Sequence, residues 1–132
     1  MRLNDDLTVD WAMQYGSSGN TNYQPQFIVE LTDGSFFLAG RDISASPAPI
    51  FIAKITSTGG VTVAKKLESS SINFEPKDMI LTADQKIAIV GNADNDRAFY
   101  AKIDLNGNPE ACYTYSASGE TFRGISVSQA HQ

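Results

Sequence analysis

Short runs of apolar residues, or of apolar residues alternating with polar ones, recur along the chain and are separated by turn residues. The runs are rich in Ile, Val, Phe, Tyr and Thr, and no window sustains the i, i+3, i+4 spacing of an amphipathic helix. Alternation with a period of two indicates half-buried strands, and short continuous apolar runs fit strands that are buried on both faces. The pattern predicts an all-β protein, with strands near residues 9–15, 26–32, 35–41, 50–56, 61–67, 77–83, 86–92, 98–104, 109–115 and 123–128.

The pattern repeats about every fifty residues, and this repeat is the most informative feature of the chain. The segment Ile28–Gly40 returns without a gap as Met79–Gly91, and Phe51–Gly59 returns as Phe99–Gly107. Partial copies lie at both ends, so the chain begins late in one repeat and stops early in another. Each complete unit holds four predicted strands, which we call A to D in chain order.

Turn residues separate the predicted strands within each unit. Thr32–Ser35 is a tight A–B turn, and Thr56–Gly60 and Asp104–Asn108 are tight C–D turns. Glycine in these turns supplies the positive φ that a hairpin turn needs. In the second unit, Asp84 is followed by Gln85 in place of glycine. We expect successive strands to pair as antiparallel hairpins.

Length, composition and charge limit the classes of function. At 132 residues the chain is long enough for one domain with a core. The net charge is -5, and the ten Lys and Arg residues are scattered, which argues against nucleic acid as a partner. No apolar run is long enough to insert in a membrane, and nothing after Met1 resembles a signal peptide.

Cysteine, histidine and acidic residues offer few candidates for catalysis or metal binding. A single cysteine, Cys112, excludes an internal disulfide and a cysteine-ligated zinc site, and its place on a D strand favours a buried side chain. His131 is the only histidine and lies one residue from the C-terminal residue, so a Ser-His-Asp site is not expected. The twelfth residue of a calcium loop starting at Asp104 would be Tyr115 rather than Glu, so a turn is the better interpretation. We predict no cofactor and no bound metal.

The order of motifs resembles a known repeat family. A Trp-x-x-x-Tyr-Gly strand at Trp11–Gly16 is followed by the Asp33–Gly34 turn, a strand ending at Gly40, and a Phe-x-x-Lys-x-Asp strand at Phe99–Asp104. This order resembles the β-propeller repeats of large secreted and cell-envelope bacterial proteins, over essentially the whole chain. The resemblance implies a partial β-propeller of about two and a half four-stranded antiparallel blades, located outside the cell or in the cell envelope.

The repeat also divides the chain into blades within a single propeller fragment. Residues 1–22 would be the end of one blade, 23–67 and 74–115 two complete blades, and 122–132 the start of the next. Because propellers need four to eight blades to close a ring, such a chain is expected to assemble with copies of itself or to belong to a larger protein.

One face of a propeller is expected to carry binding. In four-stranded radial blades the A–B and C–D turns lie on one face, and the B–C and D–A connections lie on the other. The second set is longer and more polar here, and long loops on a rigid scaffold are where binding usually takes place. The candidate binding residues are Arg41, Asp42, Asp94, Asp96 and Arg97. The alternative is that these loops are only solvated connectors.

Two sets of residues recur in every copy and favour a structural role, since an active site is normally unique. Arg2, Lys54 and Lys102 share one position, which indicates a repeated ion pair or a side chain packed along a blade. Aromatic residues recur at the start of strand A and indicate packing there. They are Tyr23, Phe74 and Phe122.

Two classes of function remain. The first is a non-catalytic interaction or structural module of β-propeller type, which self-assembles or belongs to a larger propeller and binds partners through the B–C and D–A face. The alternative is the non-catalytic part of a secreted propeller hydrolase or lyase. The sequence shows no acid pair with a positioned partner, so we expect no enzymatic activity from the chain.

Overall fold

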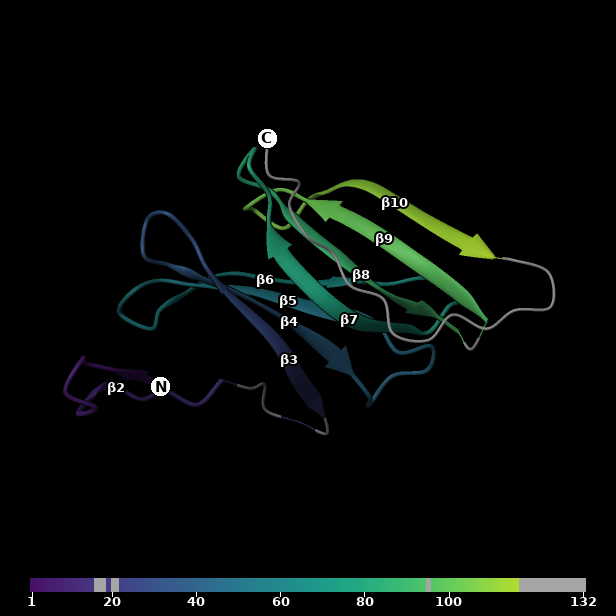
Figure 1. Ribbon diagram of the computed structural model, residues 1–132. Helices are drawn as coiled ribbons and strands as arrows, with labels where there is room; N and C mark the ends of the chain where they lie inside the picture. Colours follow the sequence, from purple (N-terminus) through teal and green to yellow (C-terminus); the bar gives the residue numbers. More distant parts are fainter. Residues whose placement is uncertain (16–18, 20–21, 95, 117–132) are drawn as a thin grey trace.

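The computed structural model describes residues 1–15, 19, 22–94 and 96–116. Within them the chain forms ten β-strands in three antiparallel sheets and no helix (Figure 1). The N-terminal hairpin is β1 (Arg2–Leu3) and β2 (Val9–Trp11). The first four-stranded sheet contains β3 (Tyr23–Glu30), β4 (Phe36–Asp42), β5 (Ile50–Ile55) and β6 (Val61–Leu67). The second contains β7 (Phe74–Leu81), β8 (Ile87–Ala93), β9 (Arg97–Ile103) and β10 (Pro109–Ser116).

The all-β prediction is confirmed, and each four-stranded sheet pairs its strands in chain order, as expected for strands A to D. The first strand of each sheet begins about three residues earlier than predicted, because Pro25 and Pro76 lie inside β3 and β7 next to a β-bulge. Both are edge strands, where proline is tolerated because one row of N–H groups has no strand to pair with. The strand predicted at 9–15 is regular only as far as Trp11, and the one predicted at 123–128 lies outside the described residues.

The five tight turns share one backbone geometry. In each, the first residue donates its N–H to the carbonyl of the fifth, and the fourth donates to the carbonyl of the first. The fourth residue has a positive φ in all five, whether it is glycine or, in two turns, Leu7 and Gln85. The turns are 4–8, 31–35, 56–60, 82–86 and 104–108. The predicted hairpins are therefore present, and Gln85 replaces glycine without changing the turn.

The main hydrophobic core lies between the two four-stranded sheets, where β7 packs across β3, β4 and β5 (Figure 1). The first sheet contributes Phe37, Ala39, Ile50 and Ile52, and the second contributes residues of β7, β8 and β9, including Met79, Ile89 and Phe99. β8 is buried on both faces, as its continuous apolar run predicts. In β4, by contrast, Phe36, Leu38 and Arg41 are only partly buried.

The N-terminal hairpin packs on the first four-stranded sheet at the turn 56–60. Atoms of Trp11 and Met13 lie within 3.2 Å of the point where a Cβ would stand on Gly59. The Trp11 indole Nε1 donates a 2.8 Å hydrogen bond to the Ser57 carbonyl, and the Tyr15 hydroxyl donates one of 2.8 Å to the Gly59 carbonyl. Glycine at residue 59 leaves space for the Met13 and Trp11 side chains and adopts the positive φ of the turn without strain.

The first four-stranded sheet packs on the second in the same way. Atoms of Val63 and Lys65 lie within 3.2 Å of the point where a Cβ would stand on Gly107, in the turn 104–108. In the sequence repeat, Val63 and Lys65 match Trp11 and Met13. The hairpin and the two sheets therefore form a series in which each last strand covers the C–D turn of the next sheet.

Candidate functional site

The end of the sheets opposite the tight turns carries the five residues that the sequence analysis selected. Arg41 and Asp42 are the last residues of β4, and Arg97 is the first of β9, so these three belong to strand ends rather than to loops. Asp94 and Asp96 lie in the short connection between β8 and β9. We call this end of the molecule the loop end.

Asn73 ties the loops of the two sheets together. Its side-chain Oδ1 accepts a 2.8 Å hydrogen bond from the Ala48 N–H in the β4–β5 loop. Its own N–H donates to Asp94 Oδ1 at 2.9 Å, and the Asp94 N–H donates to the Asn73 carbonyl at 2.8 Å. The Phe74 N–H completes the set by donating to the Ala48 carbonyl at 3.0 Å. The loop end is thus a cross-linked layer, which sequence reasoning did not foresee.

Asp94 and Arg97 form an ion pair within this layer. The hydrogen bond from the Asn73 backbone, followed by that from Arg97, holds the pKa of Asp94 below its usual value. The carboxylate of Asp96 is 4.0 Å from Arg97 Nε and its side chain is 73% exposed. The structure thus brings Asp94, Asp96 and Arg97 together, and Asp96 is the most exposed of the five candidates.

Asp42 belongs to a separate ion pair, in which the carboxylate is buried and the lysine is partly exposed. Its side chain is 1% exposed, and Oδ2 accepts a 2.6 Å hydrogen bond from Lys66 Nζ on β6. The Ser44 N–H donates to Asp42 Oδ1 at 3.0 Å, and the Lys66 ammonium lies 5.7 Å above the centre of the Tyr23 ring. Lys66 first, and then Ser44, hold the pKa of Asp42 below its usual value. In the second sheet the same repeat position holds Ala93, so this pair does not recur.

Arg41 differs from the other candidates because its charge is not compensated by a carboxylate in the described part of the chain. Its Nε is buried and makes no hydrogen bond there, and the same holds for Oδ1 of Asn92 at the equivalent position of the second sheet. The unused Nε is closed to solvent, so it is a locally unsatisfied donor rather than a group that a partner protein can reach.

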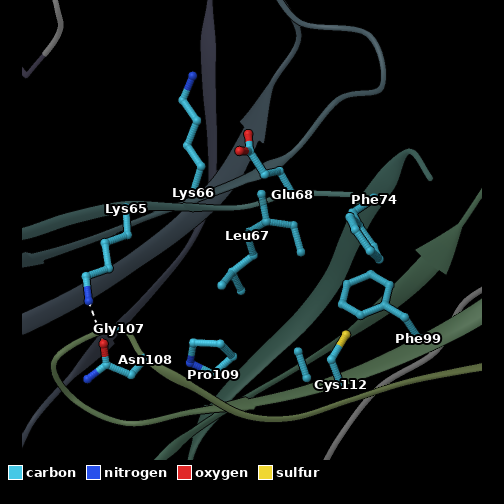
Figure 2. A pocket seen from close by; sticks show the side chains of 12 residues that line it. Lys65, Lys66, Leu67, Glu68, Phe74, Phe99, Gly107, Asn108, Pro109 and Cys112 are labelled. Atoms are coloured by element: carbon cyan, nitrogen blue, oxygen red, sulfur yellow. Dashed lines mark hydrogen bonds between the residues drawn. The ribbon is translucent and has the colours of Figure 1, made fainter. Parts of the chain in front are cut away.

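A cleft of about 370 Å³ lies between the two four-stranded sheets on the side of β6 and β10 (Figure 2). Its walls are mainly apolar and include Leu67, Phe74, Phe99, Pro109 and Cys112. At one end Lys65 Nζ donates a 2.6 Å hydrogen bond to Asn108 Oδ1, whereas the Lys66 side chain points away from the cleft. The sequence gives no signal for this cleft, because it depends on how far the last strands of neighbouring sheets diverge.

The prediction that Cys112 is buried is wrong. The residue is exposed, because β10 is an edge strand whose surface toward the cleft is not covered. Its thiol still lies against the apolar wall, and this partial desolvation raises the pKa of Cys112. The group is therefore protonated at neutral pH and a weak nucleophile.

Comparisons with known proteins add no assignment. No protein-family model matches the sequence, and a search of the curated proteins finds no match. In the described residues, no cluster of three or more His, Cys, Asp or Glu side chains has the arrangement of a metal site. That part of the chain also contains no helix long and apolar enough to cross a membrane. A function has to be argued from the geometry of the sheets.

Proposed function

We propose that the chain is a non-catalytic interaction module of β-propeller type, which self-assembles or forms part of a larger propeller. The observation that carries this proposal is the series of sheets. Trp11 and Met13 of the hairpin cover Gly59, and the equivalent residues of the first sheet cover Gly107. Neighbouring blades of a propeller meet through repeated contacts of this kind around a common axis.

The loop end is the binding face in this proposal. The Asn73 hydrogen bonds and the Asp94–Arg97 pair hold its loops in place, so a partner would meet a surface that needs little reordering. Arg41 carries a positive charge that pairs with no carboxylate among the described residues, and the exposed carboxylate of Asp96 offers an acceptor to a cationic group. The partner is a protein with both charges on its surface, outside the cell or in the cell envelope.

Native mass spectrometry at micromolar concentration tests the assembly. We expect discrete oligomers, and electron microscopy of them should show sheets arranged radially. A protein that stays monomeric at every concentration, melts cooperatively and binds no hydrophobic dye would show that the outer faces of its first and last sheets are covered by its own residues. That result would contradict self-assembly.

Activity measurements test the non-catalytic part of the proposal. Broad profiling with hydrolase, lyase and redox substrates should give no turnover that follows the folded protein through purification. Turnover that is lost in both Asp94→Asn and Asp96→Asn, but kept in the matched Asp5→Asn variant, would contradict it.

A further inference from the structure

The described part of the chain contains three last strands and three C–D turns, and the contacts within that part use only two of each. The strands are β2, β6 and β10, and the turns are 4–8, 56–60 and 104–108. β2 covers the turn 56–60, and β6 covers the turn 104–108. Among the described residues, β10 covers no C–D turn, and no last strand covers the turn 4–8.

The unused surface of β10 is aromatic and exposed. Tyr113 and Tyr115 occupy the repeat positions of Lys65 and Leu67, whose strand covers the turn 104–108. The two tyrosines are 56% and 53% exposed, and their ring centres lie 6.5 Å apart on one face of the strand. Tyrosine rings that share an exposed face supply apolar contact area together with a polar hydroxyl, a combination common in protein interfaces.

The unused turn presents the complementary apolar group. Leu7 is the fourth residue of the turn 4–8, with a φ of 66°, and so stands where Gly59 and Gly107 stand in the other two turns. Its side chain is 76% exposed. A leucine here places an apolar side chain where the glycines leave space for the covering strand, so a strand that docks on this turn would contact the Leu7 side chain rather than the turn backbone.

These two surfaces lie at opposite ends of the molecule. Figure 1 shows the N-terminal hairpin at one end of the series of sheets and β10 at the other. A single copy could bring the two surfaces together only by breaking its own stack of sheets.

We propose that Tyr113 and Tyr115 of one copy dock on the turn 4–8 of a second copy, head to tail, with Leu7 at the centre of the contact. This inference rests on the proposed function and names the partner and the surface for self-assembly. The contact continues the internal series of strand-to-turn contacts across the junction of two chains. A head-to-tail contact joins different surfaces and yields a closed ring when the rotation per copy allows it.

Two single variants test the direction of the contact. Leu7→Glu removes the turn surface and Tyr113→Glu removes the strand surface, while each leaves the other surface intact. Native mass spectrometry should show monomers for each variant alone and one-to-one heterodimers when the two are mixed. Ile43→Glu is the matched control, since Ile43 is an exposed apolar residue outside both surfaces, and this variant should assemble like the parent protein.

The other outcomes separate this contact from the proposed function. If the parent assembles and either glutamate variant assembles equally well, or if the mixture yields no heterodimer, the head-to-tail contact is wrong and self-assembly stands. If the parent is monomeric at all concentrations, self-assembly itself fails. Circular dichroism and cooperative melting show that each variant is folded.

Disulfide trapping gives a second measurement that needs no charged substitution. In a Cys112→Ser background, Leu7→Cys combined with Tyr113→Cys should form a ladder of covalent oligomers on mild oxidation, while either cysteine alone should give at most dimers. A doubly substituted protein that oxidises no further than the single variants would overturn the contact.

Discussion

Asn73 and Asp94 bind each other through two hydrogen bonds of opposite direction. The Asn73 N–H donates to the Asp94 carboxylate at 2.9 Å, and the Asp94 N–H donates to the Asn73 carbonyl at 2.8 Å. This pair fixes the segment between the two four-stranded sheets to the β8–β9 connection. Because the Asn73 side chain also accepts from Ala48, one residue joins three loops.

Removing that side chain should loosen the loop end. Asn73→Ala leaves the N–H of Ala48, a residue that is only 5% exposed, without its acceptor. We expect the free energy of unfolding to fall by about 1–2 kcal/mol, the range for a hydrogen bond lost from a buried group. Urea denaturation measures this change, with Asn106→Ala as the control because Asn106 lies on an exposed turn. Equal losses in the two variants would contradict the role of Asn73.

The core between the sheets should respond strongly to truncation. Phe37 and Ile89 are fully buried and belong to the cluster that joins the two sheets. Phe37→Ala or Ile89→Ala should each lower the free energy of unfolding by about 2–5 kcal/mol, as large core truncations do. Val61→Ala, at a residue that is 50% exposed, should change it by less than about 0.5 kcal/mol. Denaturant melts in which all three variants show the same free energy of unfolding would contradict the arrangement of the sheets.

Features that repeat could be predicted from the sequence. Lys54 and Lys102 occupy the same repeat position, and both form the predicted ion pair. Lys54 Nζ lies 3.7 Å from the Asp33 carboxylate, and Lys102 Nζ lies 2.6 Å from that of Asp84. Arg2, at the same position, pairs with Asp10 instead. A contact within one unit needs the same residue types in both copies, so it can be recognised when the two copies are aligned.

The aromatic residues at the start of strand A also pack as predicted. Tyr23 lies 5.0 Å from Phe51, and Phe74 lies 5.2 Å from Phe99, between ring centres. Phe122 lies outside the described residues. These pairs, too, are contacts within one unit, which the two copies make alike.

Features that occur once, or that arise between units, could not be predicted. The Asp42–Lys66 pair has no counterpart in the second unit, where Ala93 occupies the repeat position of Asp42, so an alignment of the repeat does not reveal it. The exposure of Cys112 depends on the divergence of the two sheets at β6 and β10. The five candidates, which are expected on one face, do not form one site: Asp42 pairs with Lys66, whereas Asp94 and Arg97 pair with each other.

Gly40 and Gly91, near the ends of β4 and β8, should not tolerate a side chain. A Cβ on Gly91 would collide with the Glu75 carbonyl oxygen, because β7 has its bulge opposite this residue. Since the obstacle is backbone, Gly91→Ala should lower the free energy of unfolding by about 2–3 kcal/mol. Gly60→Ala is the matched control, because its new methyl group would meet only the Thr56 side chain, at 3.3 Å. Thermal melts in which both variants match the parent would contradict the bulge.

The pair of Asp84 and Lys102 should make stability depend on pH in the acid range. The hydrogen bond from Lys102, and then that from Thr82, lowers the pKa of Asp84 from 3.8 to about 2. A carboxyl whose pKa is lower in the folded state stabilises the protein above its unfolded pKa, and this contribution is lost as the pH falls through the folded value. The loss attributable to Asp84 should therefore fall between about pH 4 and pH 2.

Asp84→Asn removes the titrating group, so the free energy of unfolding should fall less steeply over that interval than in the parent. Urea denaturation at several pH values measures the slope, and Asp5→Asn provides the control for removing an acidic residue in a turn. Because Lys102 and Asp84 are partly exposed, at 28% and 57% of their side chains, added salt should reduce the difference at neutral pH. Parallel curves for the parent and Asp84→Asn between pH 4 and pH 2 would show that the pair does not contribute to folding.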